Sequence, residues 1–317
     1  MVNDLIEDGE CFNLHHGDCI THMAEMPEAS VDFSVFSPPF PSLFSYTEKE
    51  SDLGNSEDLL GEAKLHFGFF FRQLRRVMKP GRIIVLHLMQ IPGLARNGQK
   101  GTFDFRGLVI RLAKQAGFIY QYDWLVAKNP QAQAIRTHSH KLLFVSLERD
   151  RAVSCGAFGD YLIKLITPGE NKVSIDSANE ITRTDWINWA EACWDDIIET
   201  DTLNVAEGRG KNDTKHICPL QLETIRRLVL LYTNPGEIVF TPFAGIGSEM
   251  FVSLGGESPK TKRRIFQPRR AYGCELKDEY YHAAINNCER AMRDYRQNKE
   301  QNLFKQEQMQ MDFEDAS

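Results

Sequence analysis

Two short motifs hold the residues best suited to chemistry. The first, Ser37-Pro38-Pro39-Phe40, directly follows a mostly apolar run from Val31 to Phe36. Two adjacent prolines cannot continue a strand, because neither donates a ladder hydrogen bond and each restricts the residue before it. A simple turn rarely needs two prolines followed by aromatic residues. The motif therefore indicates a binding loop, which offers a hydroxyl, rigid carbonyls and an aromatic ring.

The second motif is a glycine-containing loop, Thr241-Pro242-Phe243-Ala244-Gly245-Ile246-Gly247-Ser248. Its glycines let a ligand approach the backbone, and the helix that follows offers N-terminal amides. No Lys-Ser/Thr pair follows, as a P-loop requires, and the third glycine of a dinucleotide site is absent. Taken alone, the pattern is weak and favours a structural turn over a ligand site.

Glu275 ends the strand that follows the glycine loop, the usual position of a carboxylate that binds ribose hydroxyls. The interval from Gly245 to Glu275 is longer than the typical ~20 residues. A basic insertion at residues 260–270 accounts for the difference. A solvated carboxylate at a strand end is the alternative interpretation of Glu275.

The elements that carry these motifs alternate between strand and helix. Strands are expected at 12–15, 31–36, 82–88, 120–127, 141–147, 237–240 and 271–274, and helices at 65–78, 105–116, 219–233, 249–254 and 278–297. Apolar runs and apolar residues at helical spacing support these ranges. The alternation predicts an α/β fold with a doubly wound, mostly parallel sheet. Segments 120–127 and 141–147 are expected to pair as a hairpin at its edge.

The helical and strand periodicity fades between residues 148 and 215, where three tryptophans are isolated in polar sequence (Trp186, Trp189 and Trp194). A smaller, loop-rich insert is expected there. It would separate residues 1–147, which carry the first motif, from residues 216–297, which carry the glycine loop. Residues 298–317 are rich in glutamine and charge and are expected to be disordered.

Composition places the chain among ordinary globular proteins. It has 317 residues, a net charge of −7 and seven cysteines, none of them spaced as CxxC. This spacing argues against a zinc site, and no apolar run reaches the ~18–20 residues that span a bilayer. We therefore expect an intracellular, cytoplasmic protein with reduced thiols. The acidic net charge still allows a local basic patch.

Together the two motifs resemble those of the S-adenosylmethionine-dependent DNA amino-methyltransferases. Members of that family carry a Ser/Asp-Pro-Pro-Tyr/Phe catalytic loop and a Pro-Phe-x-Gly-x-Gly cofactor loop, which match residues 37–40 and 242–247 here. The resemblance extends over roughly residues 10 to 290, with Gly17-Asp18 upstream and Glu275 downstream. The catalytic motif precedes the cofactor motif, as in the permuted β-type order. The resemblance implies a Rossmann-like methyltransferase fold, with target recognition in residues 148–215.

The resemblance also assigns roles to individual residues. Ser37 and the Pro38 carbonyl would accept hydrogen bonds from an exocyclic amine, Pro39 would stiffen the loop, and Phe40 would stack on the flipped-out base. No covalent nucleophile and no metal ion are required. S-adenosylmethionine would be held by Asp18, Pro219, Thr241, Phe243, Ala244, Gly245, Gly247, Ser248 and Glu275.

The first residue of the catalytic motif bears on the target base. In the family, Ser is commoner in enzymes for cytosine N4 and Asp in those for adenine N6, so Ser37 favours cytosine and leaves adenine open. Thr241 departs from the family, which usually has Asp there, and this puts an acidic contact to the cofactor in doubt. The expected role is DNA methylation, as in restriction–modification systems.

Partners follow from charge and from the resemblance. The basic insertion has two interpretations, a solvated loop or a surface that contacts the phosphates of double-stranded DNA. We favour phosphate contacts, through Lys260, Lys262, Arg263, Arg264, Arg269 and Arg270. Further candidates are Arg136, His138, His140, Arg183, Arg209 and Lys211. A homodimer is one possible assembly. The segment Gln308–Phe313 is similar to peptides that dock on bacterial sliding clamps, although a disordered polar tail with isolated apolar residues is the favoured interpretation.

Two other interpretations remain open at this stage. The first is methylation of RNA or of a protein glutamine, by enzymes with related Pro-Pro-Tyr/Phe loops. In those enzymes the loop generally begins with Asn or Asp, and no long insert separates the two motifs. A catalytically inactive DNA-binding protein with a methyltransferase fold is the alternative of a different class, suggested by Thr241. Binding of S-adenosylmethionine separates an active enzyme from the inactive protein.

Overall fold

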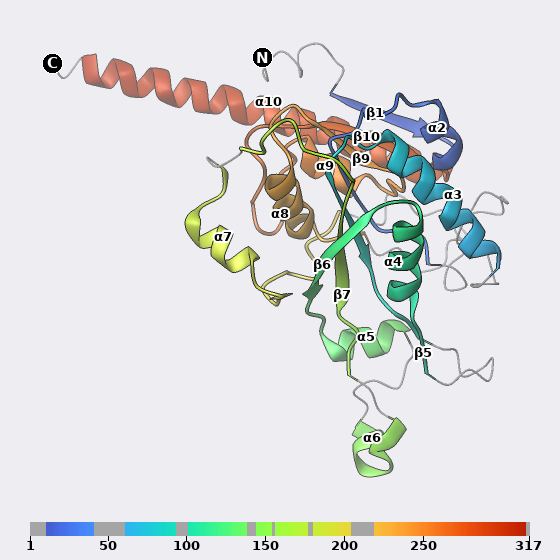
Figure 1. The fold of residues 1–317 in the computed structure, drawn as a ribbon. Helices are drawn as coiled ribbons and strands as arrows, with labels where there is room; N and C mark the ends of the chain where they lie inside the picture. Colours follow the sequence, from blue (N-terminus) through green and yellow to red (C-terminus); the bar gives the residue numbers. More distant parts are fainter. Residues whose placement is uncertain are drawn as a thin grey trace.

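The computed structural model describes residues 11–40, 61–92, 101–137, 144–153, 156–176, 180–203 and 219–314. In these residues eight strands form one sheet, in the order β1-β10-β9-β2-β3-β7-β6-β8 (Figure 1). The strands are β1 (Phe12–His16), β2 (Phe33–Phe36), β3 (Ile83–Leu88), β6 (Ile119–Val126), β7 (Asp160–Ile166), β8 (Cys193–Trp194), β9 (Ile238–Thr241) and β10 (Arg270–Glu275). Neighbours pair in parallel except at β7, which is antiparallel to both β3 and β6.

Helices cover both faces of this sheet (Figure 1). One face packs against α2 (Cys19–Glu25), α3 (Glu62–Val77) and α4 (Phe105–Gln115), and the other against α8 (Leu222–Tyr232), α9 (Ser248–Ser253) and α10 (Asp278–Glu314). Side chains of strand β2 point to both faces of the sheet, since Phe33 and Val35 join one hydrophobic cluster and Phe36 joins the other. The predicted doubly wound α/β fold is confirmed.

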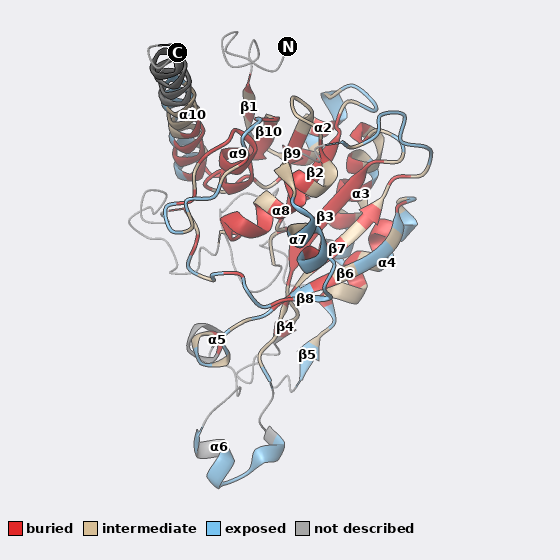
Figure 2. Ribbon diagram, turned by 90° about the vertical axis from the view of Figure 1, so that its left-hand side faces the viewer, coloured by how far each residue is buried: buried red, intermediate tan, exposed pale blue. Residues whose placement is uncertain are grey.

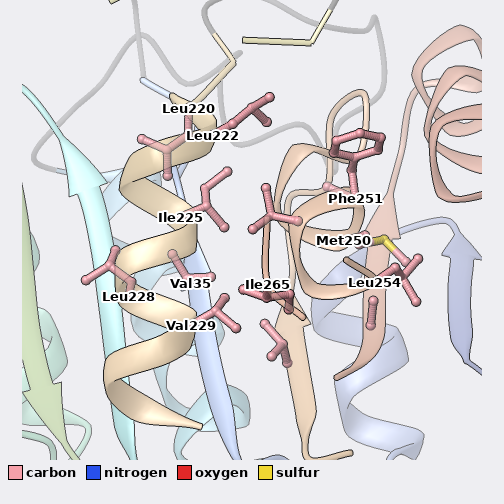
Figure 3. Close-up of a cluster of buried hydrophobic side chains, with 14 of the residues drawn as sticks. Val35, Leu220, Leu222, Ile225, Leu228, Val229, Met250, Phe251, Leu254 and Ile265 are labelled. Carbon is pink, nitrogen blue, oxygen red and sulfur yellow. The ribbon is translucent and has the colours of Figure 1, made fainter. Parts of the chain in front are cut away.

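Helices α8 and α9 pack together behind the glycine loop. Their apolar side chains form a contiguous buried cluster, which includes Ile225 and Val229 from α8 and Phe251 and, at the end of α9, Leu254 (Figure 3). None of these four side chains is more than 1% exposed. Both elements that flank the glycine loop, β9 before it and α9 after it, therefore belong to the packed core.

One expected strand is wrong. Residues 144–148 form helix α6 (Phe144–Glu148), which includes most of the predicted strand 141–147, and residues 141–143 lie outside the described residues. Strand β6 pairs instead with β7. The sheet therefore extends into the range 148–215 that the sequence assigns to an insert. Trp194 on β8 and Trp189 at the end of α7 (Arg183–Trp189) are also buried in the core.

The segment between β6 and β7 carries α5 (Pro130–Thr137), α6 and the short helix η3 (Arg151–Val153). Helices α5 and α6 lie beyond the end of the sheet, and the described side chains of α6 are exposed (Figures 1 and 2). Two short strands, β4 (Ile91–Pro92) and β5 (Thr102–Phe103), pair at the same end.

The last helix is longer than expected. The sequence predicts its end at Gln297, but α10 continues to Glu314. Residues 298–314 contain no glycine or proline and are rich in Gln, Glu, Lys and Met, which have high helix propensity. The side chains of residues 301–314, which include the clamp-like segment, are outside the described set. No helix in the described ranges has the length and apolarity needed to cross a membrane.

Candidate active site

The two motifs meet at the point where the winding of the sheet reverses. Strands β2 and β9 are parallel neighbours, with Ser34 beside Phe240. After β2 the chain forms α3 and then adds β3 on the far side of β2 from β9. After β9 it forms α9 and then adds β10 on the far side of β9 from β2. Residues 37–40 and 242–247 leave the carboxyl ends of these two strands. Such a switch point is where open α/β sheets bind ligands.

The Ser-Pro-Pro-Phe loop is anchored at its base. The Ser34 hydroxyl donates to the Phe240 carbonyl across the strands at 2.7 Å, and Pro38 is buried. Ser37 and Phe40 are half-buried, and the Phe40 ring lies 5.7 Å from that of Phe105 on α4. The loop thus holds a hydroxyl and one aromatic face near the surface on a rigid base.

Ser37 has a polar partner on strand β3 that the sequence analysis does not identify. Its hydroxyl donates to the backbone carbonyl of His87 at 3.1 Å and lies 3.2 Å from Nδ1 of the same residue. The other ring nitrogen, Nε2, lies 2.7 Å from the carboxylate of Asp160, the first residue of β7. The Lys128 ammonium contacts the same carboxylate at 2.6 Å.

This chain of side chains is shielded from water. His87 is 9% exposed and Asp160 is 5% exposed. Burial by itself would raise the pKa of Asp160, but His87 and Lys128 outweigh that effect and hold this pKa below its ordinary value. Asp160 is therefore a carboxylate at neutral pH, and it accepts the Nε2 proton of the His87 ring. In a neutral ring, Nδ1 is then the acceptor that faces Ser37.

Backbone hydrogen bonds within the glycine loop and to strand β10 hold its shape. Ala244 donates its N–H to the Cys274 carbonyl at 2.9 Å, and Gly247 donates to the Ala244 carbonyl at 2.7 Å. Gly245 has φ +53° and Gly247 has φ +82°, both in the left-handed region that favours glycine. A Cβ on Gly247 would lie 3.0 Å from Ala284, whereas a Cβ on Gly245 would meet nothing within 4 Å.

Glu275 ends strand β10, as the sequence predicts, and its carboxylate contacts this loop. One carboxylate oxygen accepts the Gly245 N–H at 2.7 Å, and the other accepts the Lys277 N–H at 2.8 Å. These two bonds fix the orientation of Glu275. Because a carboxylate has about four lone-pair sites, Glu275 can accept from ligand hydroxyls in addition.

Unpaired polar atoms around the loop fit the expected cofactor, S-adenosylmethionine. Four of the buried side-chain oxygens that lack a hydrogen-bond partner in the described residues belong to Thr241 and Ser248, which flank the loop, and to Gln221 and Thr224 at the start of α8. Such atoms are costly unless a partner is supplied. A ligand with an amino acid group, a ribose and a base can supply several. Pro219 and Leu220 directly precede Gln221, and Phe243 packs on Phe36 with ring centroids 5.7 Å apart.

Asp18 has a structural role that the sequence analysis does not include. Its carboxylate caps α2, accepting from the Thr21 backbone N–H at 2.8 Å and from the Thr21 hydroxyl at 2.7 Å. The preceding Gly17 donates its N–H to the Glu275 carbonyl at 2.9 Å. The cap therefore fixes the end of β1 beside Glu275.

The members of the basic insertion differ in their surroundings. Arg269 is 2% exposed and binds Glu180 and Thr233, so this guanidinium is a core ion-pair partner. Arg263 reaches Glu223 on α8 at 3.0 Å but stays half-exposed. The remaining members are exposed or partly buried, namely Lys260, Lys262, Arg264 and Arg270. Phosphate contacts by Arg269 would break its buried pair, which makes this residue the poorest candidate of the six.

Other DNA-contact candidates are only partly described. Arg183 is exposed at the start of α7. The side chain of Arg136, and all of His138, His140, Arg209 and Lys211, lie outside the described residues. Lys262 is also exposed, and its nearest acidic partner, Glu257, is 3.9 Å away. Lys262 is therefore a DNA-contact candidate that could turn to a phosphate without breaking a buried pair.

Comparisons with known proteins agree with this geometry. A family model described as DNA methylase matches residues 31–286. The curated proteins gave no match. Among solved structures, a candidate DNA modification methylase from Thermus thermophilus is 22% identical with a TM-score of 0.63, and the match covers 88% of this chain and 95% of that one.

Two further structures have similar scores. A complex of that Thermus thermophilus protein with S-adenosyl-L-methionine is 20% identical with a TM-score of 0.62, covering 88% of this chain and 95% of that one. The cytosine-N4-specific PvuII DNA methyltransferase is 17% identical with a TM-score of 0.61, covering 87% of this chain and 86% of that one. These likenesses show a shared fold.

The family match is more informative, because it spans most of the chain and includes both motifs at the switch point. The protein therefore belongs to the N6/N4 DNA methylase family, the S-adenosylmethionine-dependent DNA amino-methyltransferases.

Proposed function

We propose that this enzyme methylates the N4 amine of cytosine in double-stranded DNA, in the crevice between β2 and β9. The observation that carries this proposal is the environment of Ser37. This hydroxyl lies at the switch point and directs its only proton toward His87. Its lone pairs are therefore available to accept an N–H from an amine. The cytosine-N4-specific PvuII enzyme, with the same fold, supports the choice of base.

Ser37 and Pro38 would act on the amine together. The amine lone pair is delocalised into the base ring, and two hydrogen bonds from its N–H groups pull the nitrogen toward a tetrahedral, nucleophilic form. Because Pro38 is buried and proline fixes the backbone, the acceptors need little reorganisation in the transition state. Bound S-adenosylmethionine supplies an electrophilic methyl group at this point.

Phe40 would cover the flipped-out base. Its ring already packs on Phe105 from one side and remains partly exposed. A base inside a duplex cannot reach Ser37, so the target nucleotide must leave the stack. An aromatic face held by a neighbouring ring offers a ready stacking surface for it.

The cofactor would lie over the glycine loop, between Glu275 and the start of α8. Glu275 would accept from the ribose hydroxyls, since its orientation is fixed by the loop. Gly245 would face the ligand, since a Cβ there meets no protein atom within 4 Å. Thr241 takes the position usually held by Asp in the family, and its buried, unpaired hydroxyl would supply a polar contact in that place.

The segment between β6 and β7 is our choice for target recognition. Val126 pairs with Asp160 and Leu88 pairs with Tyr161, so residues 127–159 leave the sheet at the edge that carries His87 and Ser37. Helices α5 and α6 belong to this segment and lie beyond the sheet (Figure 1). The range differs from the insert 148–215 predicted from sequence, because β7 belongs to the sheet.

The test is to sequence DNA from a host that expresses the protein, with detection of modified bases. We expect N4-methylcytosine at one recurring sequence. N6-methyladenine at that sequence would overturn the choice of base, and unmodified DNA from a host with folded protein would contradict the proposal as a whole. The second candidate, adenine N6, rests on the family, which includes both activities.

A further inference from the structure

Ser37, His87 and Asp160 form a connected chain that amine methylation by itself does not explain. A hydroxyl within reach of an imidazole, which a buried carboxylate orients, is the arrangement that moves a proton to or from a hydroxyl. Here the steps measure 3.2 Å and 2.7 Å, and both His87 and Asp160 are buried. A carboxylate that merely balanced Lys128 would not need a histidine between itself and Ser37.

Methylation of an amine releases a proton, and the chain offers an acceptor for it. We propose that His87, oriented by Asp160, takes up through Ser37 the proton that the amine loses on methylation. The inference rests on the proposed role of Ser37 as the amine acceptor. His87 itself acts through Ser37 and does not touch the base.

The amine nitrogen forms its bond to the methyl carbon as the bond from that carbon to sulfur breaks, and the electron pair of the broken bond stays on sulfur. The Ser37 hydroxyl turns from the His87 carbonyl, 3.1 Å away, to Nδ1, 3.2 Å away, and gives its proton to the ring. The amine N–H bond breaks at the same time, and the amine proton moves to Ser37 Oγ. Ser37 is restored, and the cationic ring passes its proton to water after the product leaves.

The surroundings of His87 suit this cycle. In the described residues, Asp160 is the charged group that contacts the ring, at Nε2, and Lys128 contacts Asp160 in turn. Asp160 stabilises the cationic ring once the proton arrives. Lys128 prevents the carboxylate from taking the proton outright, because it favours the charged form of Asp160.

The test is a pH profile of single-turnover methyl transfer with labelled S-adenosylmethionine and host DNA. In the wild type the rate should fall on the acid side, because a protonated His87 cannot accept a proton. His87→Asn places an amide near Nδ1 but does not titrate. We expect its rate to be about 100-fold lower, in line with general base catalysis, and to lack the acid limb. Affinity for S-adenosylmethionine should not change.

Two further variants keep the test decisive. His282→Asn is the matched control, since His282 is an exposed histidine that also contacts an aspartate, Asp278, at 3.5 Å. It should leave rate and pH profile unchanged. Ser37→Ala removes the link to His87, so its residual rate should lack the acid limb, and Ser37→Ala with His87→Asn should be no slower than Ser37→Ala alone.

The results that would overturn the proton relay differ from those that would refute the proposed function. A wild-type protein that binds S-adenosylmethionine but transfers no methyl group would refute the function. An active wild type with an unchanged His87→Asn rate, or an acid limb that persists in Ser37→Ala, would overturn the relay alone. If His87→Asn fails to bind S-adenosylmethionine because it misfolds, the Ser37→Ala profile decides the question.

Discussion

Gly245 and Gly247 allow the cofactor site to be tested with one substitution made at two places. Both residues have positive φ, +53° and +82°, in the same loop. Replacement by alanine in this region should cost each variant about 1–2 kcal/mol of stability. The surroundings differ, since a Cβ on Gly245 meets no protein atom within 4 Å, whereas one on Gly247 lies 3.0 Å from Ala284 on α10.

The two variants should therefore fail in different ways. Gly247→Ala forces α9 and α10 apart and should cost a further amount of about 1–3 kcal/mol, as overpacking does. Gly245→Ala adds no conflict within the protein, but its methyl group points into the open space over the loop. We expect it to lose most of its affinity for S-adenosylmethionine while it remains folded.

Thermal unfolding and calorimetric titration with S-adenosylmethionine separate these effects. Gly245→Ala should unfold closer to the wild-type temperature and bind at least about tenfold more weakly, a loss of about 1.4 kcal/mol. Gly247→Ala should show the larger drop in unfolding temperature. Wild-type affinity in a folded Gly245→Ala protein would show that the cofactor does not lie over this loop.

Two further predictions concern buried charge. Burial raises the pKa of Glu249 from 4.5 to about 8, so the native state holds this proton over that range and stability should fall with rising pH by about 1.4 kcal/mol per unit. Glu249→Gln should flatten the slope in urea unfolding between pH 6 and 8, and an unchanged slope would contradict the burial of this group. Arg269→Met should lower stability by about 3–5 kcal/mol, because it leaves Glu180 buried without its partner. Lys262→Met, at an exposed position, should leave stability unchanged but weaken DNA binding and reduce its salt dependence. Unchanged stability with weaker DNA binding in Arg269→Met would instead support Arg269 as a DNA contact.

The fold followed from sequence where the pattern was long and regular. Apolar β-branched residues in β3 and helical spacing in α3 located both elements within a few residues. Strand β7 was missed because its sequence, DYLIKLI, lies in a stretch without a neighbouring strand or helix pattern. Its partners β3 and β6 are distant in the chain, and only tertiary pairing selects it over the run at 141–147.

The candidate site could likewise be predicted only in part. Both motifs could be placed because their loops directly follow strands, and the parallel order brings the loops together. The sequence offered one unused signal for His87, a polar residue near the end of the apolar strand RIIVLHL. Asp160 lies 73 residues further on, so no spacing rule connects the two. The burial of Arg269 could not be predicted, because a run of basic residues does not reveal which member is buried.

The most direct test of the central claim is methyl transfer to DNA by Ser37→Ala compared with the wild type. With labelled S-adenosylmethionine and DNA from an unmodified host, the wild type should produce N4-methylcytosine. Ser37→Ala should bind the cofactor with unchanged affinity, because the described hydrogen bonds of the Ser37 hydroxyl go to His87. Its single-turnover rate should fall by about 100-fold or more. A rate equal to the wild type's would contradict the role of Ser37 as the amine acceptor.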